Sequence, residues 1–178
     1  MAASDGYLGT VGALARALDS QGFEPVLVGG MALVLLGSQR VTRDFDLLVS
    51  TQGASTEDLV RLMYRHRLEL VTKFTPEGEV KRTVDNVRIA VAKLKTDPPQ
   101  SLFFFDPKTG LRVDLLLDFP LPAHGVAQRA DTVKVGSGGL RVASPADLLR
   151  LKEIAYADRR SASDAQDLEF LRRKMQGS

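Results

Sequence analysis

The sequence contains no cysteine and no tryptophan, and it has only two histidines. The missing cysteines exclude disulfide bonds, zinc–thiolate sites and thiol nucleophiles at once. His66 lies in an arginine-rich segment and His124 in a Pro/Gly-containing one, and neither has a partner in the sequence that suggests nucleophilic catalysis. We therefore expect no catalysis by a thiolate or by a histidine-activated nucleophile.

Long apolar runs are absent as well. No stretch approaches the ~20 apolar residues that a membrane-spanning helix needs. Residues 1–6 lack the basic start and apolar segment of a signal peptide. These features favour a cytoplasmic protein. The 178 residues are 44% hydrophobic and 26% charged, which predicts a globular protein of one domain or one domain plus a small helical appendage.

The net charge is only +2, and the sequence pI is about 9.0. Basic residues gather in three segments, at residues 61–67, 159–160 and 172–174. Solvated helix faces explain most such clusters, and contact with phosphate or RNA is the alternative interpretation. The charge alone does not decide between them.

The first 65 residues alternate between helical and extended patterns. They predict helices over residues 8–18, 31–36 and 55–65, and strands over residues 25–28 and 43–49. Gly22 is placed to end the first helix. Ser55 or Thr56 is placed to cap the third, with Glu57 and Asp58 in its first turn.

The middle of the chain is rich in extended patterns. It predicts strands over residues 68–74, 80–84, 87–94, 101–105 and 111–119. The segment 106–110 contains proline and glycine between two apolar runs, which predicts a hairpin. The run 115–117 is apolar on both faces, so we expect its strand to be central in the sheet.

The last 35 residues predict a pair of helices. Ser144 with Pro145 and Asp147 forms a strong helix start, for a helix to about residue 156. Ser163 opens a second capping box, for a final helix to about residue 174. We therefore expect an α/β (α+β) fold, with a core over residues 1–143 that has a short mixed sheet flanked by helices, and a helical pair over residues 144–178.

Two aspartates separated by one residue, Asp44 and Asp46, stand at the start of an apolar strand. Residues i and i+2 of a strand point to the same face, so the two carboxylates lie side by side. Such a pair is costly unless a cation neutralises it. Together with the glycine pair Gly29–Gly30, which can admit a phosphate, the pattern indicates Mg²⁺ and a nucleotide.

The order of these motifs resembles that of the polymerase-beta-type nucleotidyltransferase superfamily. A strand ends in Gly29–Gly30, thirteen residues follow, then Asp44-Phe45-Asp46, and later Asp114 stands inside an apolar strand. The chain looks most like the small bacterial members, among them the toxins of abortive-infection (type IV) toxin–antitoxin systems and the antibiotic nucleotidyltransferases. Residues 144–152 and 159–168 also have the look of the toxin-like branch.

The resemblance implies an enzyme that moves a nucleoside monophosphate from a nucleoside triphosphate (NTP) to a hydroxyl. Asp44, Asp46 and Asp114 would be catalytic residues and ligands of two Mg²⁺ ions, with Asp46 bridging the ions. Asp114 would complete the ion that activates the hydroxyl and would itself be able to accept the proton.

The resemblance also implies residues for the nucleotide. Gly29 and Gly30 would let the backbone approach the triphosphate. Arg40 or Arg43 would neutralise a phosphate oxygen. Lys152 shares a helical face with Leu148 and Tyr156, and a lysine there faces the active-site cleft in the branch that the chain resembles. The resemblance thus implies a nucleotide-binding set of Gly29, Gly30, Arg40, Arg43 and Lys152.

Several alternatives stay open. Asp114 is also explained as a buried acid paired with Arg112, and Asp118 lies on the same strand face and competes for the role of third carboxylate. Arg40 and Arg43 are also explained as surface residues. The acceptor is RNA, protein or a small molecule such as an antibiotic. The other functional hypotheses are a non-catalytic nucleotide-binding module, an antitoxin-type partner module and a metal-dependent hydrolase.

Overall fold

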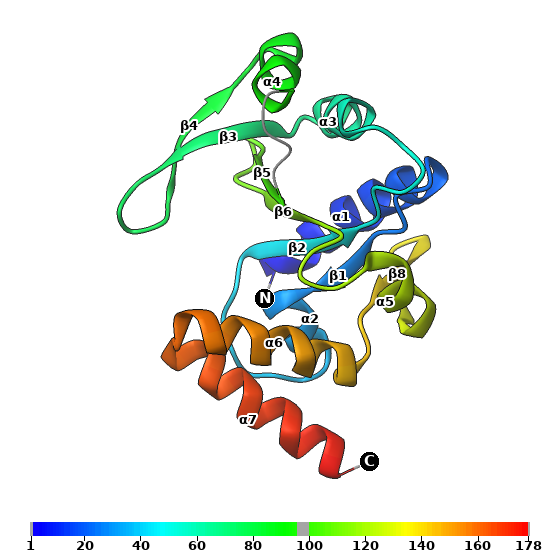
Figure 1. Cartoon of the computed structure of the whole chain (residues 1–178), viewed down its shortest axis with the longest axis vertical. Helices are drawn as coiled ribbons and strands as arrows, with labels where there is room; N and C mark the ends of the chain where they lie inside the picture. The colour runs from blue at the N-terminus through cyan, green and yellow to red at the C-terminus, as the bar shows by residue number, and fades with distance from the viewer. Residues whose placement is uncertain (1, 96–99, 178) are drawn as a thin grey trace.

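The computed structural model describes residues 2–95 and 100–177, whose eight strands form a single mixed sheet (Figure 1). The helices are α1 (Ala2–Ser20), α2 (Gly29–Leu35), α3 (Thr56–Arg65), α4 (Val87–Leu94), α5 (Ala123–Arg129), α6 (Pro145–Arg159) and α7 (Ala162–Gln176). The strands are β1 (Val26–Val28), β2 (Asp44–Val49), β3 (Glu69–Phe74), β4 (Val80–Val84), β5 (Ser101–Phe105), β6 (Arg112–Leu117), β7 (Asp131–Val135) and β8 (Gly138–Val142). Their order is β4-β3-β5-β6-β2-β1-β8-β7. The expected mixed α/β class is confirmed.

The centre of the sheet places three strand ends together. β2 runs parallel to β6 and antiparallel to β1, so the starts of β2 and β6 meet the end of β1. Alternate residues of β2 and β6, such as Phe45, Leu47 and Val113, are fully buried in the core. Burying each such side chain contributes about 2 kcal/mol. Asp44 and Asp46 of β2 and Arg112, Asp114 and Leu116 of β6 alternate with them and line a cavity on the other side.

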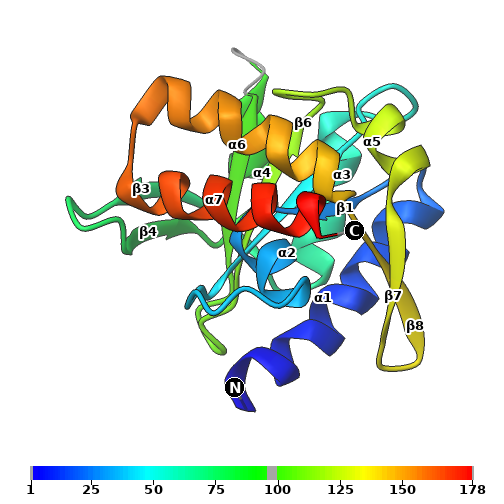
Figure 2. The ribbon, with the colours of Figure 1, turned by 90° about the horizontal axis from the view of Figure 1, so that it is seen from below.

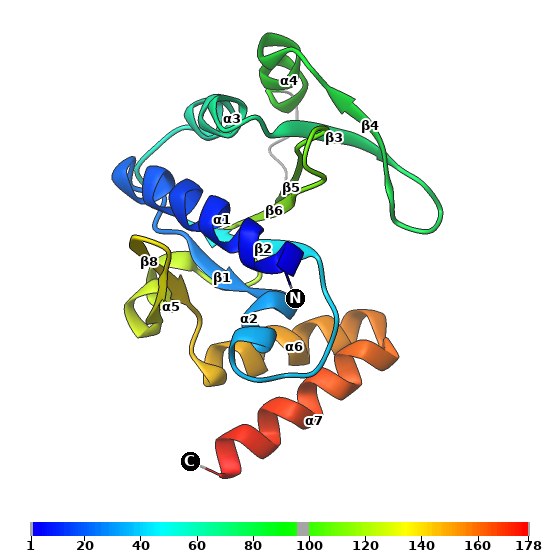
Figure 3. The same cartoon turned by 180° about the vertical axis from the view of Figure 1, so that it is seen from behind.

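Helices enclose the sheet on more than one side. α1 crosses behind the sheet in Figure 1 and in front of it in Figure 3, and it contacts β7, β8 and α3. α6 and α7 lie together below the sheet in both views, beside α2. Within the part of the chain that the structure describes, no helix is long and apolar enough to cross a membrane.

The C-terminal helical pair is confirmed, with a different cap on α7. Figure 2 shows α6 and α7 packed along each other. Ser144 caps α6 as predicted, since its hydroxyl accepts from the Asp147 amide. α7 is capped by Ser161, which accepts from the Asp164 amide at 3.1 Å, so the prediction of a start at Ser163 was wrong by two residues. The left-handed Arg160 (φ 50°) ends α6 and turns the chain directly into the cap. The division at residue 143 stays a prediction.

Residues 87–94 form helix α4 rather than the predicted strand. The side chain of Asn86 caps it by accepting from the amides of Arg88 and Ile89. The buried residues Ala90 and Val91 belong to a helical stripe, whereas Ile89 is half-exposed. The β-branched residues suggested a strand, but the cap and the packing of this stripe decide for a helix.

Residues 120–143 carried no prediction, and they form α5, β7 and β8. Gly136, at φ +58°, makes the tight turn of the β7–β8 hairpin. β8 pairs parallel with β1 and so extends the sheet on the far side of the site. The alternation of apolar residues around the glycines of this segment is a strand signal that sequence reasoning passed over.

Candidate active site

A cavity of about 940 Å³ opens between the carboxylate-bearing strand ends and the C-terminal helices. One wall comes from the β1–α2 junction, β2, β5 and β6, and the other from α6, α7 and the turn between them. The polar residues of the lining include Arg40, Thr42, Asp44, Asp46, Ser101, Arg112, Asp114, Lys152, Asp158, Arg159, Ser161, Ser163 and Asp164. Of the eight residues predicted for the site, seven are in this lining, and Arg43 is the exception.

Gly29 is shaped by its contact with Asp46. The residue adopts φ +68°, and a Cβ added there would lie 2.1 Å from Asp46 Oδ2. Only glycine both tolerates that backbone conformation easily and leaves the space that the carboxylate occupies. The glycine pair therefore belongs to the carboxylate site itself as well as to the turn after β1.

The three predicted carboxylates lie on neighbouring strands. In the parallel pairing of β2 and β6, Asp46 is the register partner of Asp114, and Asp44 is the partner of Arg112. The side chain of Asp44 is 44% exposed and that of Asp114 is only 9% exposed. The i, i+2 spacing thus brings Asp44, Asp46 and Asp114 to one face, as the sequence predicted.

Burial beside this grouping of negative charge raises the pKa of Asp46 to about 7. Burial is the main cause, and the charges of Asp114 and Asp44 add to it, while Lys152 and Arg112 act in the opposite direction. A carboxylate in such surroundings is partly protonated at neutral pH. A bound cation would favour its ionised form, so Asp46 is electrostatically suited to hold one.

Arg112 holds the carboxylate of Asp114. Its Nε and Nη2 donate to the two oxygens of Asp114, each at 3.0 Å, and its Nη1 lies 3.6 Å from Asp44 Oδ2. Burial nevertheless raises the pKa of Asp114, because it outweighs the effect of the arginine. The predicted alternative of an Arg112–Asp114 pair and the predicted position at the site are therefore both realised.

The donors fit Mg²⁺ in kind, since hard carboxylate oxygens are its usual protein ligands. In arrangement, no group of three or more His, Cys, Asp or Glu side chains within residues 2–95 and 100–177 is placed to hold a metal ion. In this arrangement both oxygens of Asp114 accept from the Arg112 guanidinium. Asp44, Asp46 and Asp114 would hold the metal once Asp114 turned from the arginine.

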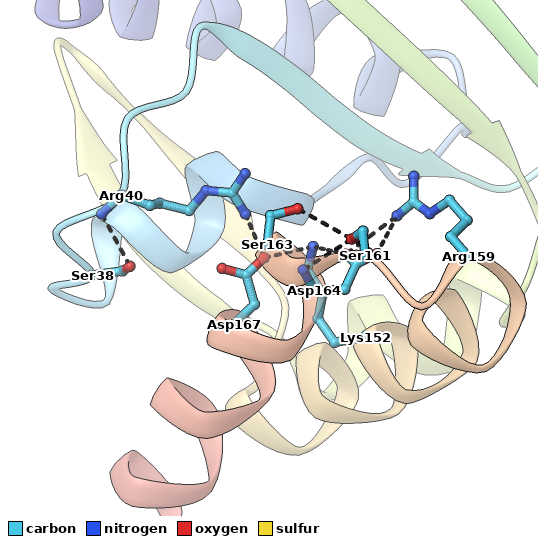
Figure 4. Close-up of polar contacts among 8 residues, drawn as sticks. All are labelled: Ser38, Arg40, Lys152, Arg159, Ser161, Ser163, Asp164 and Asp167. Carbon is cyan, nitrogen blue, oxygen red and sulfur yellow. Dashed lines mark hydrogen bonds and ion pairs between the residues drawn. The ribbon is translucent and has the colours of Figure 1, made fainter.

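Lys152 faces the carboxylates across the cavity, at the centre of a polar network between α6 and α7 (Figure 4). Its ammonium lies 3.1 Å from Asp164 and 2.8 Å from Asp167. Asp164 also accepts from the Ser161 hydroxyl at 2.6 Å and contacts Arg159. Burial alone would raise the pKa of Asp164, but these hydrogen bonds and charges hold it below its usual value.

Arg40 joins the same network from the loop before β2. Its Nη1 pairs with Asp167, and its guanidinium carbon lies 3.0 Å from where a Cβ on Gly30 would be. Arg40 therefore packs over the glycine turn and lines the cavity, as expected of a nucleotide-binding residue. Arg43 is exposed on the outside of the same loop, so its placement favours the alternative of a surface residue.

Asp118 is placed for a structural role. Its carboxylate accepts from the amide and hydroxyl of Thr51 and from the amide of Ala123, at 2.8, 2.9 and 2.9 Å. Burial acts to raise its pKa, but these three hydrogen bonds hold the pKa below its usual value. The side chain ties the end of β6 to neighbouring loops, which leaves Asp114 as the third carboxylate beside Asp44 and Asp46.

Sequence reasoning missed the apolar and C-terminal parts of the lining. Phe103, in the first strand of the predicted hairpin, lines the cavity beside its register partner Asp114. Asp164 and Asp167 are buried partners of Lys152. Asp164 and Asp167 stand one helical turn apart in the sequence, but only the folding of α6 against α7 brings them to Lys152.

The family of the chain follows from its sequence as a whole. The family model for the nucleotidyl transferase AbiEii toxin of type IV toxin–antitoxin systems matches residues 12–177. The chain belongs to this family. The AbiEii match thus includes both the aspartate-bearing strands and the helices that carry Lys152 and Asp164.

Solved structures agree on the fold. An antigenic nucleotidyltransferase-like protein from Paracoccidioides brasiliensis is 19% identical, with a TM-score of 0.54 over 92% of this chain and 74% of that protein. A nucleotidyltransferase candidate from Thermotoga maritima is 14% identical, with a TM-score of 0.50 over 97% of this chain and 94% of that one. No curated protein matches the chain. The predicted nucleotidyltransferase fold is confirmed.

Proposed function

We propose that this AbiEii-family protein is a Mg²⁺-dependent enzyme that transfers a nucleoside monophosphate from an NTP to an acceptor hydroxyl. One observation carries the proposal. Asp44, Asp46 and Asp114 share one face at the end of the sheet, inside a cavity that also presents Lys152. A cavity that sets three carboxylates opposite a lysine matches the chemistry of a metal-bound triphosphate.

The chain's own residues would bind and orient the donor. Gly29 and Gly30 leave the space beside them to the Asp46 carboxylate and the Arg40 guanidinium, so they would bring a metal ligand and a phosphate-binding cation close to the turn that meets the triphosphate. Lys152 and Arg40 project into the cavity with positive charge, and both are held in place by Asp167. Binding of the triphosphate would bring phosphate oxygens to these cations as further partners.

The transfer step balances as a displacement at the α-phosphorus. The acceptor oxygen forms a bond to that phosphorus, the bond to the β-phosphate oxygen breaks, and pyrophosphate leaves. The acceptor proton passes to a carboxylate, for which we propose Asp114. Two Mg²⁺ ions held by Asp44, Asp46 and Asp114 would supply charge stabilisation at the attacking and leaving oxygens.

For the acceptor we favour RNA or protein, because the family is one of toxins. The same membership supports an antitoxin partner for this chain. The donor is a cytoplasmic metabolite, and we place the reaction in the cytoplasm for that reason. Modification of an antibiotic is the nearest enzymatic alternative, and nucleotide binding without transfer is the alternative outside catalysis.

The acceptor class is tested by incubating the protein with Mg²⁺ and each NTP carrying ³²P at the α-position. Separate reactions contain bacterial RNA, bacterial protein or an aminoglycoside. We expect label on RNA or protein, and label on the antibiotic would replace that part of the proposal. Asp46→Asn should abolish labelling, whereas Asp131→Asn, an exposed residue on β7 outside the cavity lining, should not change it. Binding of NTP without labelling of any acceptor would contradict the proposal that the protein is an enzyme.

A further inference from the structure

Arg112 places a cation of the protein itself among the proposed metal ligands. Its guanidinium engages both oxygens of Asp114 at 3.0 Å and reaches to 3.6 Å from Asp44 Oδ2. A planar fork matches the two oxygens of a carboxylate, which makes a bidentate pair stronger than a single contact. The arginine thus already supplies the positive charge that a metal would bring to Asp114.

Arg112 is also held from the side of the β3–β4 arm, which projects from one edge of the sheet (Figure 1). Its guanidinium carbon lies 4.8 Å from the ring centre of Phe74 and 5.9 Å from that of Phe103. The two rings meet edge to face at 5.3 Å, and Nη1 donates to the Gly78 carbonyl at 3.3 Å. Such contacts with ring faces stabilise a cation and fix its position.

We propose that Arg112 is a positioning residue that competes with the divalent metal for Asp114. In the metal-free protein it engages both oxygens of the third carboxylate, and metal binding requires that Asp114 be released from it. The inference rests on the carboxylate site of the proposed function, and it assigns to Arg112 the control of metal affinity there.

The proposal makes a directional claim about affinity. Without the arginine, both oxygens of Asp114 are free to ligate, so Arg112→Gln should bind metal more tightly than the wild type. If Arg112 instead oriented Asp114 for the metal, the same substitution would weaken binding. Arg112→Lys keeps the charge but lacks the fork, so it separates the effect of geometry from that of charge.

The experiment is a titration with Mn²⁺ alone, in which electron paramagnetic resonance measures the free ion without any nucleotide. We expect Arg112→Gln to lower the Mn²⁺ dissociation constant tenfold or more, and Arg112→Lys to lower it by about threefold, in keeping with the weaker single contact of an ammonium. The matched control is Arg141→Gln, which removes another arginine–aspartate pair, with Asp19 at 2.7 and 3.4 Å, remote from this cavity. It should leave the constant unchanged.

A double-mutant cycle attributes the effect to Asp114. In the Asp114→Asn background, Arg112→Gln should change the dissociation constant by less than twofold. Three results would overturn the proposal. They are an unchanged or weaker Mn²⁺ affinity in Arg112→Gln, the same tightening by Arg112→Gln in the Asp114→Asn background, and no Mn²⁺ binding by any variant. Should Arg112→Gln not fold, Arg112→Lys is judged by the direction of its change. Tightening without any nucleotide transfer would retain this inference and reject the proposed reaction, so the two failures are distinguishable.

Discussion

The carboxylate of Asp46 occupies the space that a side chain on residue 29 would need. A Cβ built on Gly29 would lie 2.1 Å from Asp46 Oδ2 and 2.9 Å from its Cγ, and Gly29 has φ +68°. The turn that ends β1 and the acid at the start of β2 are therefore one structural unit. A side chain added at residue 29 would therefore require the Asp46 carboxylate to move.

Gly29→Ala should displace Asp46 and abolish nucleotide transfer. The positive φ alone costs an alanine about 1–2 kcal/mol of unfolding free energy, and the contact with the carboxylate adds to that. Denaturant unfolding and transfer assays measure the two effects. Gly136→Ala is the matched control, because Gly136 has φ +58° and nothing within 4 Å of its added Cβ. It should lose similar backbone energy and keep activity; equal activity in the two variants would contradict the account.

Asp46 should make the stability of the metal-free protein depend on pH. Its pKa in the folded protein is about 7, above the ordinary value of 3.8, so the folded state holds a proton that the unfolded chain has released between these values. The free energy of unfolding should therefore fall as the pH rises from about 4 to 7, through this group. Asp46→Asn should flatten that part of the profile. A profile as steep in the variant as in the wild type would show that Asp46 does not titrate there.

Lys152→Met should both destabilise the protein and abolish transfer. It leaves the buried Asp164 and Asp167 without their shared ammonium, which we expect to cost about 1–3 kcal/mol because both acids keep other partners. Arg159→Ala removes a contact to the same Asp164 from a side chain that is 62% exposed. Its cost in chemical denaturation should stay under about 1 kcal/mol. Similar losses in the two variants would argue against Lys152 as the centre of the network.

The cap of α7 can be located by two serine substitutions. Ser161→Ala removes the oxygen that accepts from the Asp164 amide and should lower the unfolding free energy by about 1 kcal/mol. Ser163→Ala lies inside the first turn of the helix and should change it by less than about 0.5 kcal/mol. Thermal unfolding of both variants gives the comparison. The reverse order would place the cap at Ser163.

Local signals in the sequence were enough for most elements near the site. The i, i+2 spacing of Asp44 and Asp46 required only a strand, and the apolar run around Asp114 predicted a central strand. Residues 87–94 could not be assigned by residue type, because β-branched side chains there pack as one helical stripe. The pairing of Lys152 with Asp164 and Asp167 depends on how two helices dock, and no local pattern contains that information.

The role of the contact between Arg112 and Asp114 could not be predicted from the sequence. Their spacing allowed either an ion pair or a catalytic acid, and the structure realises the pair inside the cavity. Phe74 and Gly78, more than thirty residues away in the chain, hold the arginine there. Contacts of this kind arise from the tertiary fold, so the sequence motif alone could not predict them.

The central claim is that the cavity transfers a nucleotidyl group through Asp46. Its most direct test compares two NTP preparations, one labelled with ³²P at the α-position and one at the γ-position. Each is incubated with the wild type and with Asp46→Asn, together with the acceptor class that the wild type modifies. The account predicts acceptor label only from the α-position, γ-label recovered as pyrophosphate, and neither product with Asp46→Asn. Acceptor label from the γ-position, or undiminished α-label with Asp46→Asn, would contradict it.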